Sequence, residues 1–257
     1  MFSKANAKLE KLADVPVLAQ FLENKRKVYS FDLLSGHSCP FAEKCLSKVK
    51  MVDGKRKIQD GTKTEFRCFS ASQEVMYTNV YNRRNDNLQS LRGLSMSGMV
   101  DLISSNQPKN LGICRIHVAG DFFNRDYFNA WLQVAIDNPD RLYYAYTKSL
   151  PYWIDRQSDI PYNFVLTASR GGRRDNLITE HGLRESVVVY SEQEARSLGL
   201  EIDHDDSHAA NPDTREQSFA LLIHGVQPAG SEAAQAIKAL KDANVQFSYS
   251  RKAKVNV

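Results

Sequence analysis

The chain has 257 residues, of which 42% are hydrophobic and 25% charged, and its formal net charge is +4. These values are typical of a globular protein. No apolar run approaches the roughly 18 residues that span a bilayer, and the first residues lack the apolar core of a signal peptide. We therefore expect a cytoplasmic protein without a membrane partner, whose four cysteines stay reduced.

The charge is unevenly distributed along the chain. Residues 1–67 contain 14 Lys and Arg against 8 Asp and Glu, whereas residues 182–218 contain 3 against 9. A basic N-terminal third favours an anionic substrate, such as a nucleotide or a nucleic acid. A solvated basic face is the alternative interpretation.

The N-terminal third mixes helices with one clear strand. The pattern predicts a helix over 15–26, a strand over 28–34, and a polar excursion over about 49–65 that could be a hairpin. Apolar residues at helical spacing then predict a helix over 72–94, and 100–105 should continue in helix.

The rest of the chain alternates regularly between strands and helices. Helices are predicted over 126–136, 151–156, 192–197 and 232–242. The intervening strands are nearly continuous apolar runs, as a sheet covered on both faces requires. These strands are predicted at 113–118, 142–147, 163–168, 186–190 and 219–224.

This alternation predicts a single α/β domain over residues 1–257 with mostly parallel strands. Six or so strands in this length fit a full or partial (β/α) barrel. A doubly wound open sheet is the alternative. A cysteine-bearing segment, residues 28–71, precedes the regular part and contains the excursion.

In both architectures the functional residues collect beyond the carboxyl ends of the strands. The first predicted strand is followed by Cys39 and Cys45, and Cys68 comes 23 residues later. Three thiolates can hold most of a zinc site or an iron–sulfur cluster. There is no close pair of the C-x2-C type that structural zinc prefers, which favours a [4Fe–4S] cluster with an open iron; three ordinary thiols are the other interpretation. Cys114, inside an apolar strand, is predicted to be a core residue.

The later strand ends supply the other candidate site residues. Asp121 follows Gly120 and could act as a base or bind a ribose, or else cap a helix. Lys148 could clamp a phosphate or carboxylate. His117 is either a site residue or a core histidine.

A glycine turn follows the strand at 163–168. Its residues Arg170, Gly171 and Gly172 could cradle a phosphate through backbone N–H groups and a guanidinium. The loop Asp203-His204-Asp205-Asp206-Ser207-His208 has the composition of a hard-metal site, but a solvated acidic loop is the favoured interpretation.

Several of these segments resemble a bacteriophage family known as gene product 88. The similar stretches read Ser-Gly-x-x-Cys-Pro at 35–40, Cys-Phe-Ser-Ala at 68–71, His-x-x-Gly-Asp-Phe at 117–122, Tyr-Thr-Lys at 146–148 and Leu-Leu-Ile-His-Gly at 221–225. They span roughly residues 28–245. The resemblance implies a phage protein in the host cytoplasm and carries no settled activity.

More distantly, the order of elements resembles phage proteins with a radical-SAM-like partial barrel. In those proteins a cluster motif ending in Cys-aromatic-Ala precedes strands of which one ends in Thr-Lys, as Cys68–Ala71 and Thr147-Lys148 do here. The resemblance implies a [4Fe–4S] cluster on Cys39, Cys45 and Cys68 and S-adenosylmethionine (SAM) as a further cofactor. The cysteines here are spaced more widely than the usual C-x3-C-x2-C.

Three functions remain open from the sequence. The first is an Fe–S enzyme of radical SAM type that modifies a nucleotide or nucleic acid, in which Asp121, Lys148 and Arg170 bind SAM or substrate. The second is a deazaguanine transglycosylase-like base-exchange enzyme with zinc, in which Asp121 is the nucleophile. The third is a non-catalytic nucleic-acid-binding or host-interaction protein whose metal is structural.

Overall fold

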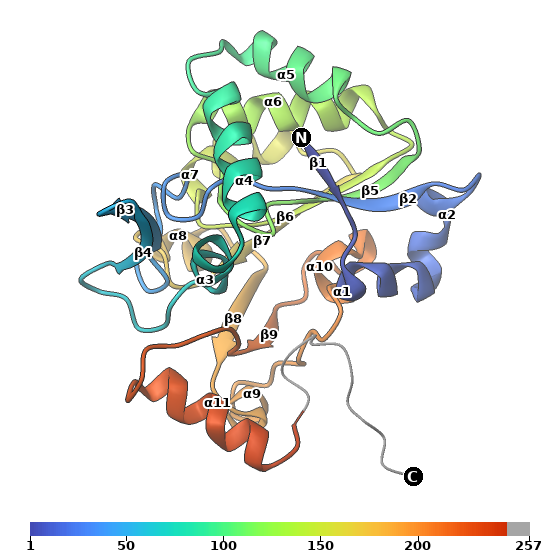
Figure 1. The fold of residues 1–257 in the computed structure, drawn as a ribbon. Coiled ribbons are helices and arrows are strands. Elements are labelled where there is room, and N and C mark those ends of the chain that lie inside the picture. The colour runs from blue at the N-terminus through green and yellow to red at the C-terminus, as the bar shows by residue number, and fades with distance from the viewer. Residues whose placement is uncertain (246–257) are drawn as a thin grey trace.

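The computed structural model describes residues 1–245, and its central feature is one seven-stranded sheet (Figure 1). The expected domain's last stretch, 246–257, lies outside the described residues. The strands are β1 (Phe2–Lys4), β2 (Lys27–Phe31), β3 (Ser47–Val52), β4 (Lys55–Asp60), β5 (Leu111–Ile116), β6 (Leu142–Thr147), β7 (Phe164–Ser169), β8 (Glu185–Val189) and β9 (Phe219–Leu222). The α-helices are α1 (Ala7–Glu10), α2 (Ala19–Leu22), α3 (Phe69–Met76), α4 (Thr78–Leu91), α5 (Met96–Ser105), α6 (Arg125–Asp137), α7 (Leu150–Ile154), α8 (Asn176–Glu180), α9 (Glu192–Ser197), α10 (Ser207–Ala210) and α11 (Glu232–Asp242).

The sheet has the order β1-β2-β5-β6-β7-β8-β9. β1 pairs antiparallel with β2, and every other neighbouring pair is parallel. Each new strand is added at the same edge, as in a (β/α) barrel, but within residues 1–245 β9 does not pair back to the first strands. The α/β prediction is therefore confirmed as a partial barrel. The full barrel is wrong, and so is the doubly wound alternative, because the strand order never reverses.

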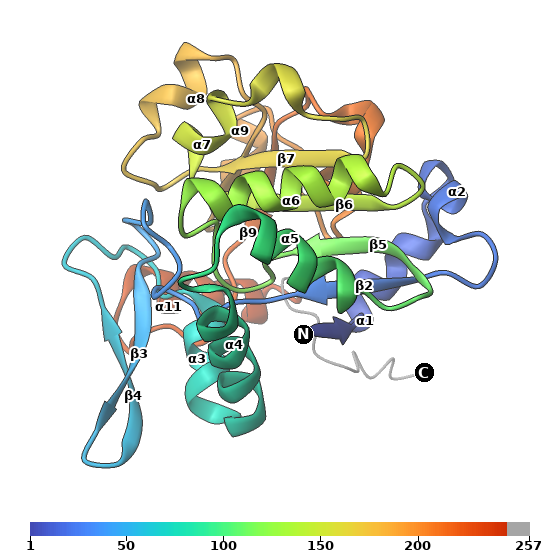
Figure 2. The same ribbon diagram turned by 90° about the horizontal axis from the view of Figure 1, so that it is seen from above.

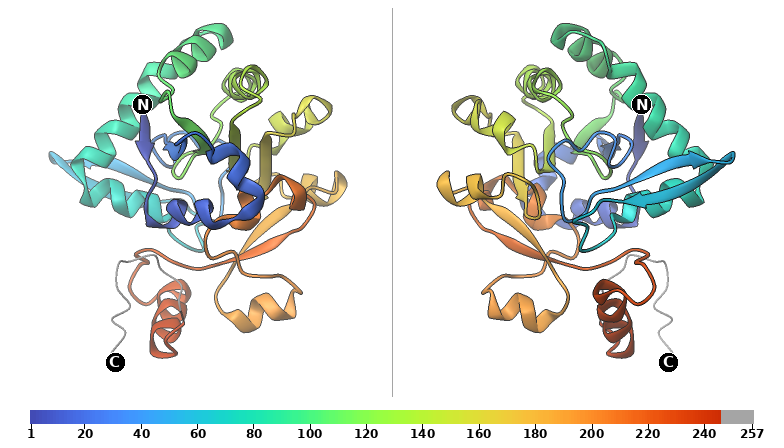
Figure 3. Two further views of the ribbon diagram at one scale, coloured as in Figure 1. Left: turned by 90° about the vertical axis from the view of Figure 1, so that its right-hand side faces the viewer. Right: turned by 90° about the vertical axis from the view of Figure 1, so that its left-hand side faces the viewer.

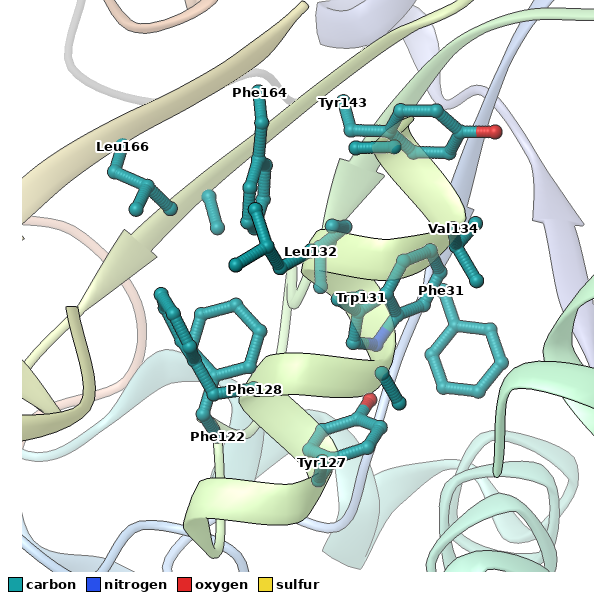
Figure 4. Packing of buried hydrophobic residues seen from close by; sticks show 14 of the residues in the cluster. Phe31, Phe122, Tyr127, Phe128, Trp131, Leu132, Val134, Tyr143, Phe164 and Leu166 are labelled. Atoms are coloured by element: carbon teal, nitrogen blue, oxygen red, sulfur yellow. The ribbon is translucent and has the colours of Figure 1, made fainter. Parts of the chain in front are cut away.

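Helices α4, α5 and α6 cover one face of the sheet with an aromatic core. Trp131 of α6 packs edge-on against Phe31 of β2, with ring centroids 5.2 Å apart, and Phe128 lies 6.1 Å from Phe164 of β7 (Figure 4). The stripe on α6 is buried because its apolar residues recur at helical spacing. Fully burying side chains of this size stabilises the fold by roughly 1.5–3 kcal/mol each.

The opposite face is covered by the N-terminal segment and by α10. Successive residues of β6 alternate between the two faces, so that Tyr143 packs with α6 while Tyr144 packs with Leu9 and Ala209. Figure 3 shows the N-terminal helices, in dark blue, on the side of the sheet away from the green helices. A third core joins β8 and β9 to α9 and α11, at the end of the molecule (Figure 3).

The structure corrects several predicted elements. The helix expected over 15–26 is a 3-10 turn, Pro16–Leu18, followed by the short α2. The helix expected over 72–94 is two helices, because Tyr77 has an extended backbone between α3 and α4. The excursion at 49–65 is the hairpin β3–β4, as the pattern allowed. Within residues 1–245 no helix has both the length and the apolar character needed to cross a membrane.

Candidate functional site

The candidate site lies at the edge of the sheet where the parallel strands end. The chain leaves β2 at Phe31 and forms a loop, residues 32–46, which we call the cysteine loop because it carries Cys39 and Cys45. Cys68 stands at the N-terminus of α3. All three thiols are free and partly buried, whereas Cys114 is fully buried in β5, as predicted.

The thiols of Cys39 and Cys68 are both close enough to Cys45 for its charge to affect their ionisation. Burial raises the pKa of Cys39 well above its ordinary value, and the charges of Asp121, Cys68 and Cys45 raise it further. Burial, together with Cys45, raises the pKa of Cys68 to about 11. Cys39 and Cys68 are therefore neutral thiols at neutral pH, and a bound cation would favour their thiolate forms. Within residues 1–245 no three His, Cys, Asp or Glu side chains are already arranged around a common point as metal ligands.

The cysteine loop is held directly on the glycine turn after β7. Ala42 and Gly172 form an antiparallel bridge. The backbone N–H of Lys44 donates to the Gly171 carbonyl at 2.9 Å, and that of Arg173 donates to the Phe41 carbonyl at 2.9 Å. The predicted glycine turn thus binds the loop that carries two of the cysteines.

A second contact joins the cysteine loop to the end of β5. Gly120 has φ +93°, and a Cβ atom at this position would lie 2.6 Å from Ser38 Oγ and 2.7 Å from Leu33 Cβ. Only glycine combines this backbone conformation with so close an approach. The cysteine loop can lie against the β5 end because residue 120 has no side chain.

Cys68 is anchored between the hairpin and the end of β9. Its backbone N–H donates to Ser47 Oγ at 3.3 Å. The adjacent Arg67 exchanges two hydrogen bonds with the side chain of Gln227, of 2.7 and 3.0 Å. The ring of Phe69 lies 4.8 Å from that of His224. These contacts hold Cys68 at the same edge of the sheet as the cysteine loop, and we call this edge the rim.

A buried ion pair fixes the first turn of the cysteine loop. Glu74 of α3 accepts hydrogen bonds from the backbone N–H and hydroxyl of Ser35, at 3.0 and 2.7 Å, and from Arg84 at 3.0 Å. Burial raises the pKa of Glu74 above its ordinary value, although Arg84 and Ser35 oppose the shift. This contact links the segments of Cys39 and Cys68 through buried charge.

Asp121 is at the rim but is not free. It is 4% exposed. One carboxylate oxygen accepts from Thr147 Oγ1 at 2.6 Å and from the Phe122 N–H at 2.8 Å, and the other accepts from the Lys148 N–H at 2.9 Å. Burial raises its pKa above the ordinary value despite these bonds. In this arrangement Asp121 ties the end of β5 to the end of β6.

Lys148 and the glycine turn also make internal contacts. The Lys148 ammonium donates to the Ser169 carbonyl at 2.8 Å, to Ser169 Oγ at 2.7 Å and to the Arg170 carbonyl at 3.1 Å. Arg170 pairs with Glu185 through two hydrogen bonds. The N–H groups of Gly171 and Gly172 do bind a carboxylate, but it is that of Asp175, at 2.7 and 2.9 Å.

His117 faces the aromatic core and not the cysteines. Its backbone is left-handed, with φ +65°, and its Nε2 forms a 3.0 Å hydrogen bond with Tyr127 of α6. Burial lowers its pKa to about 3, so the ring is neutral. Nδ1 is buried without a hydrogen-bond partner among the described residues. Its surroundings match the core-histidine interpretation of this residue.

Sequence reasoning missed a buried polar network on the sheet face that the N-terminal segment and α10 cover. Asp203 and Asp206 are buried, so the solvated acidic loop expected at 203–208 is wrong. Asp206 pairs with Arg115 of β5 and accepts from the Tyr144 hydroxyl at 2.9 Å. The available signal was Arg115 itself, a charge within an apolar strand that requires a buried partner.

The rim therefore carries three thiols, of Cys39, Cys45 and Cys68, on segments that short polar contacts hold in place.

Comparison with known proteins adds one finding. The family described as gene product 88 matches residues 1–243. No curated protein and no solved structure is significantly similar to the chain. The chain belongs to the bacteriophage gene product 88 family.

Proposed function

We propose that this chain is an Fe–S enzyme resembling radical SAM proteins. Cys39, Cys45 and Cys68 would hold a [4Fe–4S] cluster and leave one iron open. The observation that supports this most strongly is that two separate segments bring three thiols to the carboxyl edge of a partial barrel, where Cys45 lies close enough to raise the pKa of both Cys39 and Cys68. Parallel sheets concentrate their chemistry at this edge.

The donor set fits an iron–sulfur cluster. Clusters are held by cysteine thiolates, and a three-cysteine set leaves one iron available for another ligand. A bound cluster would supply one-electron chemistry, and its open iron would bind SAM through amino and carboxylate groups. Because no three donors yet surround one point in residues 1–245, the proposal requires the cysteine loop to shift on loading.

The other predicted site residues act in this proposal by positioning. The Gly171-Gly172 turn holds the cysteine loop, and Lys148 holds the turn through Ser169 and Arg170. Asp121 links two strand ends next to Cys39. Arg170, whose side chain is 39% exposed, is the candidate among these residues for contact with an anionic cofactor or substrate.

The transglycosylase alternative needs Asp121 as a nucleophile. Both of its carboxylate oxygens already accept hydrogen bonds, and the side chain is almost fully buried. A nucleophile needs an exposed lone pair aimed at the substrate. The geometry therefore favours the Fe–S proposal over the base-exchange enzyme, although zinc remains an alternative metal for the three thiols.

Metal analysis of protein purified without oxygen tests the proposal. We expect about four irons and four sulfides per chain and a broad absorption band near ~400 nm. Cys39→Ala, Cys45→Ala and Cys68→Ala should each lose most of the iron. Cys114→Ala is the matched control, because this thiol is sealed in β5, and it should keep the iron.

Two results would overturn the Fe–S proposal, and a third would remove the evidence that the cysteines are its ligands. About one zinc per chain with no iron would replace it with a zinc protein. A metal-free protein after anaerobic reconstitution with iron and sulfide would leave the three residues as ordinary thiols. Equal iron loss from Cys114→Ala and Cys39→Ala would show that the effect comes from folding and not from ligation.

A further inference from the structure

The hairpin β3–β4 projects from the body of the protein beside the cysteine rim (Figures 1 and 2). Its two six-residue strands pair in full register, from Ser47 opposite Asp60 to Val52 opposite Lys55. Six residues at about 3.3 Å each make a ribbon about 20 Å long. The tight turn is Asp53-Gly54, and both residues have positive φ.

One face of this ribbon packs on α3 and α4. Val49 is 2% exposed, and its partner Ile58 is partly buried on the same face. Arg56 donates to the Val75 carbonyl at 3.3 Å and to Thr78 Oγ1 at 2.7 Å, and its guanidinium lies 5.5 Å from the ring of Tyr81. These contacts fix which face of the ribbon points outward.

The outward face carries four lysines. Because side chains alternate along a strand, Lys48, Lys50, Lys55 and Lys57 share the face opposite to Val49. Lys50 and Lys57 stand directly opposite each other. Like charges in this position destabilise a sheet. Such a pair makes physical sense where an external anion neutralises it.

None of these four ammonium groups forms an ion pair with any residue in 1–245. The lysines just outside the ribbon behave differently, since Lys44 pairs with Glu65 and Lys63 pairs with Glu43, each at 2.8 Å. The ribbon face therefore keeps its positive charges available while neighbouring charges are neutralised internally.

We propose that this lysine face binds the phosphate backbone of a nucleic acid. The ribbon is a projecting surface, whereas a free nucleotide needs a concave pocket that encloses it. Alternate residues on a strand are about 7 Å apart, close to two steps along a nucleic-acid strand with one phosphate per roughly 3.4 Å. A two-stranded ribbon also fits the major groove of a duplex.

The ribbon is joined to the proposed catalytic rim. His37 Nε2 forms a 2.8 Å hydrogen bond with the Val49 carbonyl, and a Cβ at Gly36 would lie 2.7 Å from Lys48 Cβ. A strand bound on the ribbon therefore lies beside the cysteine loop. The inference rests on the proposed function in one respect: the bound nucleic acid is taken to be the substrate of the Fe–S enzyme.

Fluorescence anisotropy with a 20-base-pair duplex and the matching single strand tests the inference over a range of salt concentrations. The variant replaces the four lysines by Gln (K48Q, K50Q, K55Q, K57Q). The matched control replaces four exposed lysines away from the rim (K25Q, K109Q, K238Q, K241Q). The two variants have the same net charge, and urea unfolding checks that both fold.

We expect the ribbon variant to lose at least tenfold in affinity at low salt and the control to lose far less. Each lost phosphate contact lowers the slope of log affinity against log salt by about 0.9 for a duplex, so the loss of four contacts should lower it by about 3.6. Equal losses in the two variants, or equal wild-type binding to polyglutamate at the same salt, would overturn the inference.

The same titration separates this inference from the Fe–S proposal. Wild-type protein stripped of metal should still bind nucleic acid, because the ribbon needs no cluster to form. Ribbon-dependent binding by a protein that takes up no iron on anaerobic reconstitution would leave the inference standing and refute the Fe–S proposal. A protein that holds iron, but whose nucleic-acid binding does not depend on the ribbon lysines, would leave the Fe–S proposal standing and refute the inference.

Discussion

Asp206 shows how one buried carboxylate organises the sheet face covered by the N-terminal segment and α10. It sits at φ +66° before α10 and pairs with Lys8 of α1 at 2.5 Å and with Arg115 of β5. Burial alone would raise the pKa of Asp206, but the charges of Arg115 and Lys8 outweigh burial and lower it. Removing one partner of such a buried pair is strongly destabilising, because the remaining charge is left uncompensated.

His208, on α10, makes the stability of this region depend on pH. Asp203, 3.8 Å from Nδ1, is the main cause that raises the His208 pKa to about 9, and Glu201, 3.0 Å from Nε2, adds to it. A raised pKa stabilises the fold fully below pH 6.5, and this contribution is lost as the pH rises through 9. Because Glu201 is well exposed, we expect only about 1–2 kcal/mol.

Urea unfolding at pH 6, 7.5 and 9.5 measures this effect. His208→Gln should flatten the fall in unfolding free energy between pH 6.5 and 9. His181→Gln, at an exposed position, is the control and should keep the wild-type slope. A variant at 208 with the unchanged wild-type pH dependence would contradict the assignment.

The connection from β5 to the cysteine loop depends on Gly120. An alanine there would place its Cβ 2.6 Å from Ser38 Oγ and 2.7 Å from Leu33 Cβ, at φ +93°. Gly120→Ala should therefore destabilise the protein by about 2–4 kcal/mol, through backbone strain and overpacking together. It should also increase the reactivity of Cys39 toward a thiol reagent, because the loop must move away from the strand end.

Gly182→Ala is the matched control for this prediction. Gly182 also has positive φ, +58°, but a Cβ there would meet nothing within 4 Å. It should cost about 1 kcal/mol and leave Cys39 unchanged. Equal effects of the two substitutions on urea unfolding and on thiol reactivity would show that close packing at Gly120 does not hold the loop.

The strands were predictable where burial on both faces dictates their composition. β6 to β9 begin within one residue of their predicted starts, whereas β5 begins two residues before its predicted start, and β5 and β9 end two residues early. The N-terminal strand was predicted to reach residue 34, but it stops at Phe31 because the Val118 N–H donates to the Asp32 side chain at 2.8 Å. That contact joins residues 86 apart and leaves no local pattern.

The site was predictable in position but not in its internal bonding. The rule for parallel sheets placed Cys39, Asp121, Lys148 and the glycine turn at one edge, and the structure has them there, whereas it could not place Cys68, which follows the hairpin. The rule could not show that the Thr147 hydroxyl would donate a hydrogen bond to Asp121, or that the Asp175 carboxylate would accept one from the glycine turn. Both depend on how loops from different strands meet.

The whole molecule separates its cores from its candidate metal site. The two main cores contain the large buried aromatic residues and none of Cys39, Cys45 and Cys68. The cysteine loop is attached to the ends of β5 and β7 by backbone contacts. A metal at these thiols would therefore link strand ends that are already folded, and the sheet should not need it to form.

Removing the metal should accordingly lower the thermal stability without unfolding the chain. A metal at 100 times its Kd stabilises the folded state by about 2.7 kcal/mol, which corresponds to about 5–10 °C for a protein of this size. Thermal melts of loaded and chelated protein should differ by this amount, with the same far-ultraviolet circular dichroism at 25 °C. Cys68→Ala should melt at one temperature under both conditions. Loss of the circular dichroism signal on chelation would instead identify a structural metal, because the fold would then depend on its binding energy.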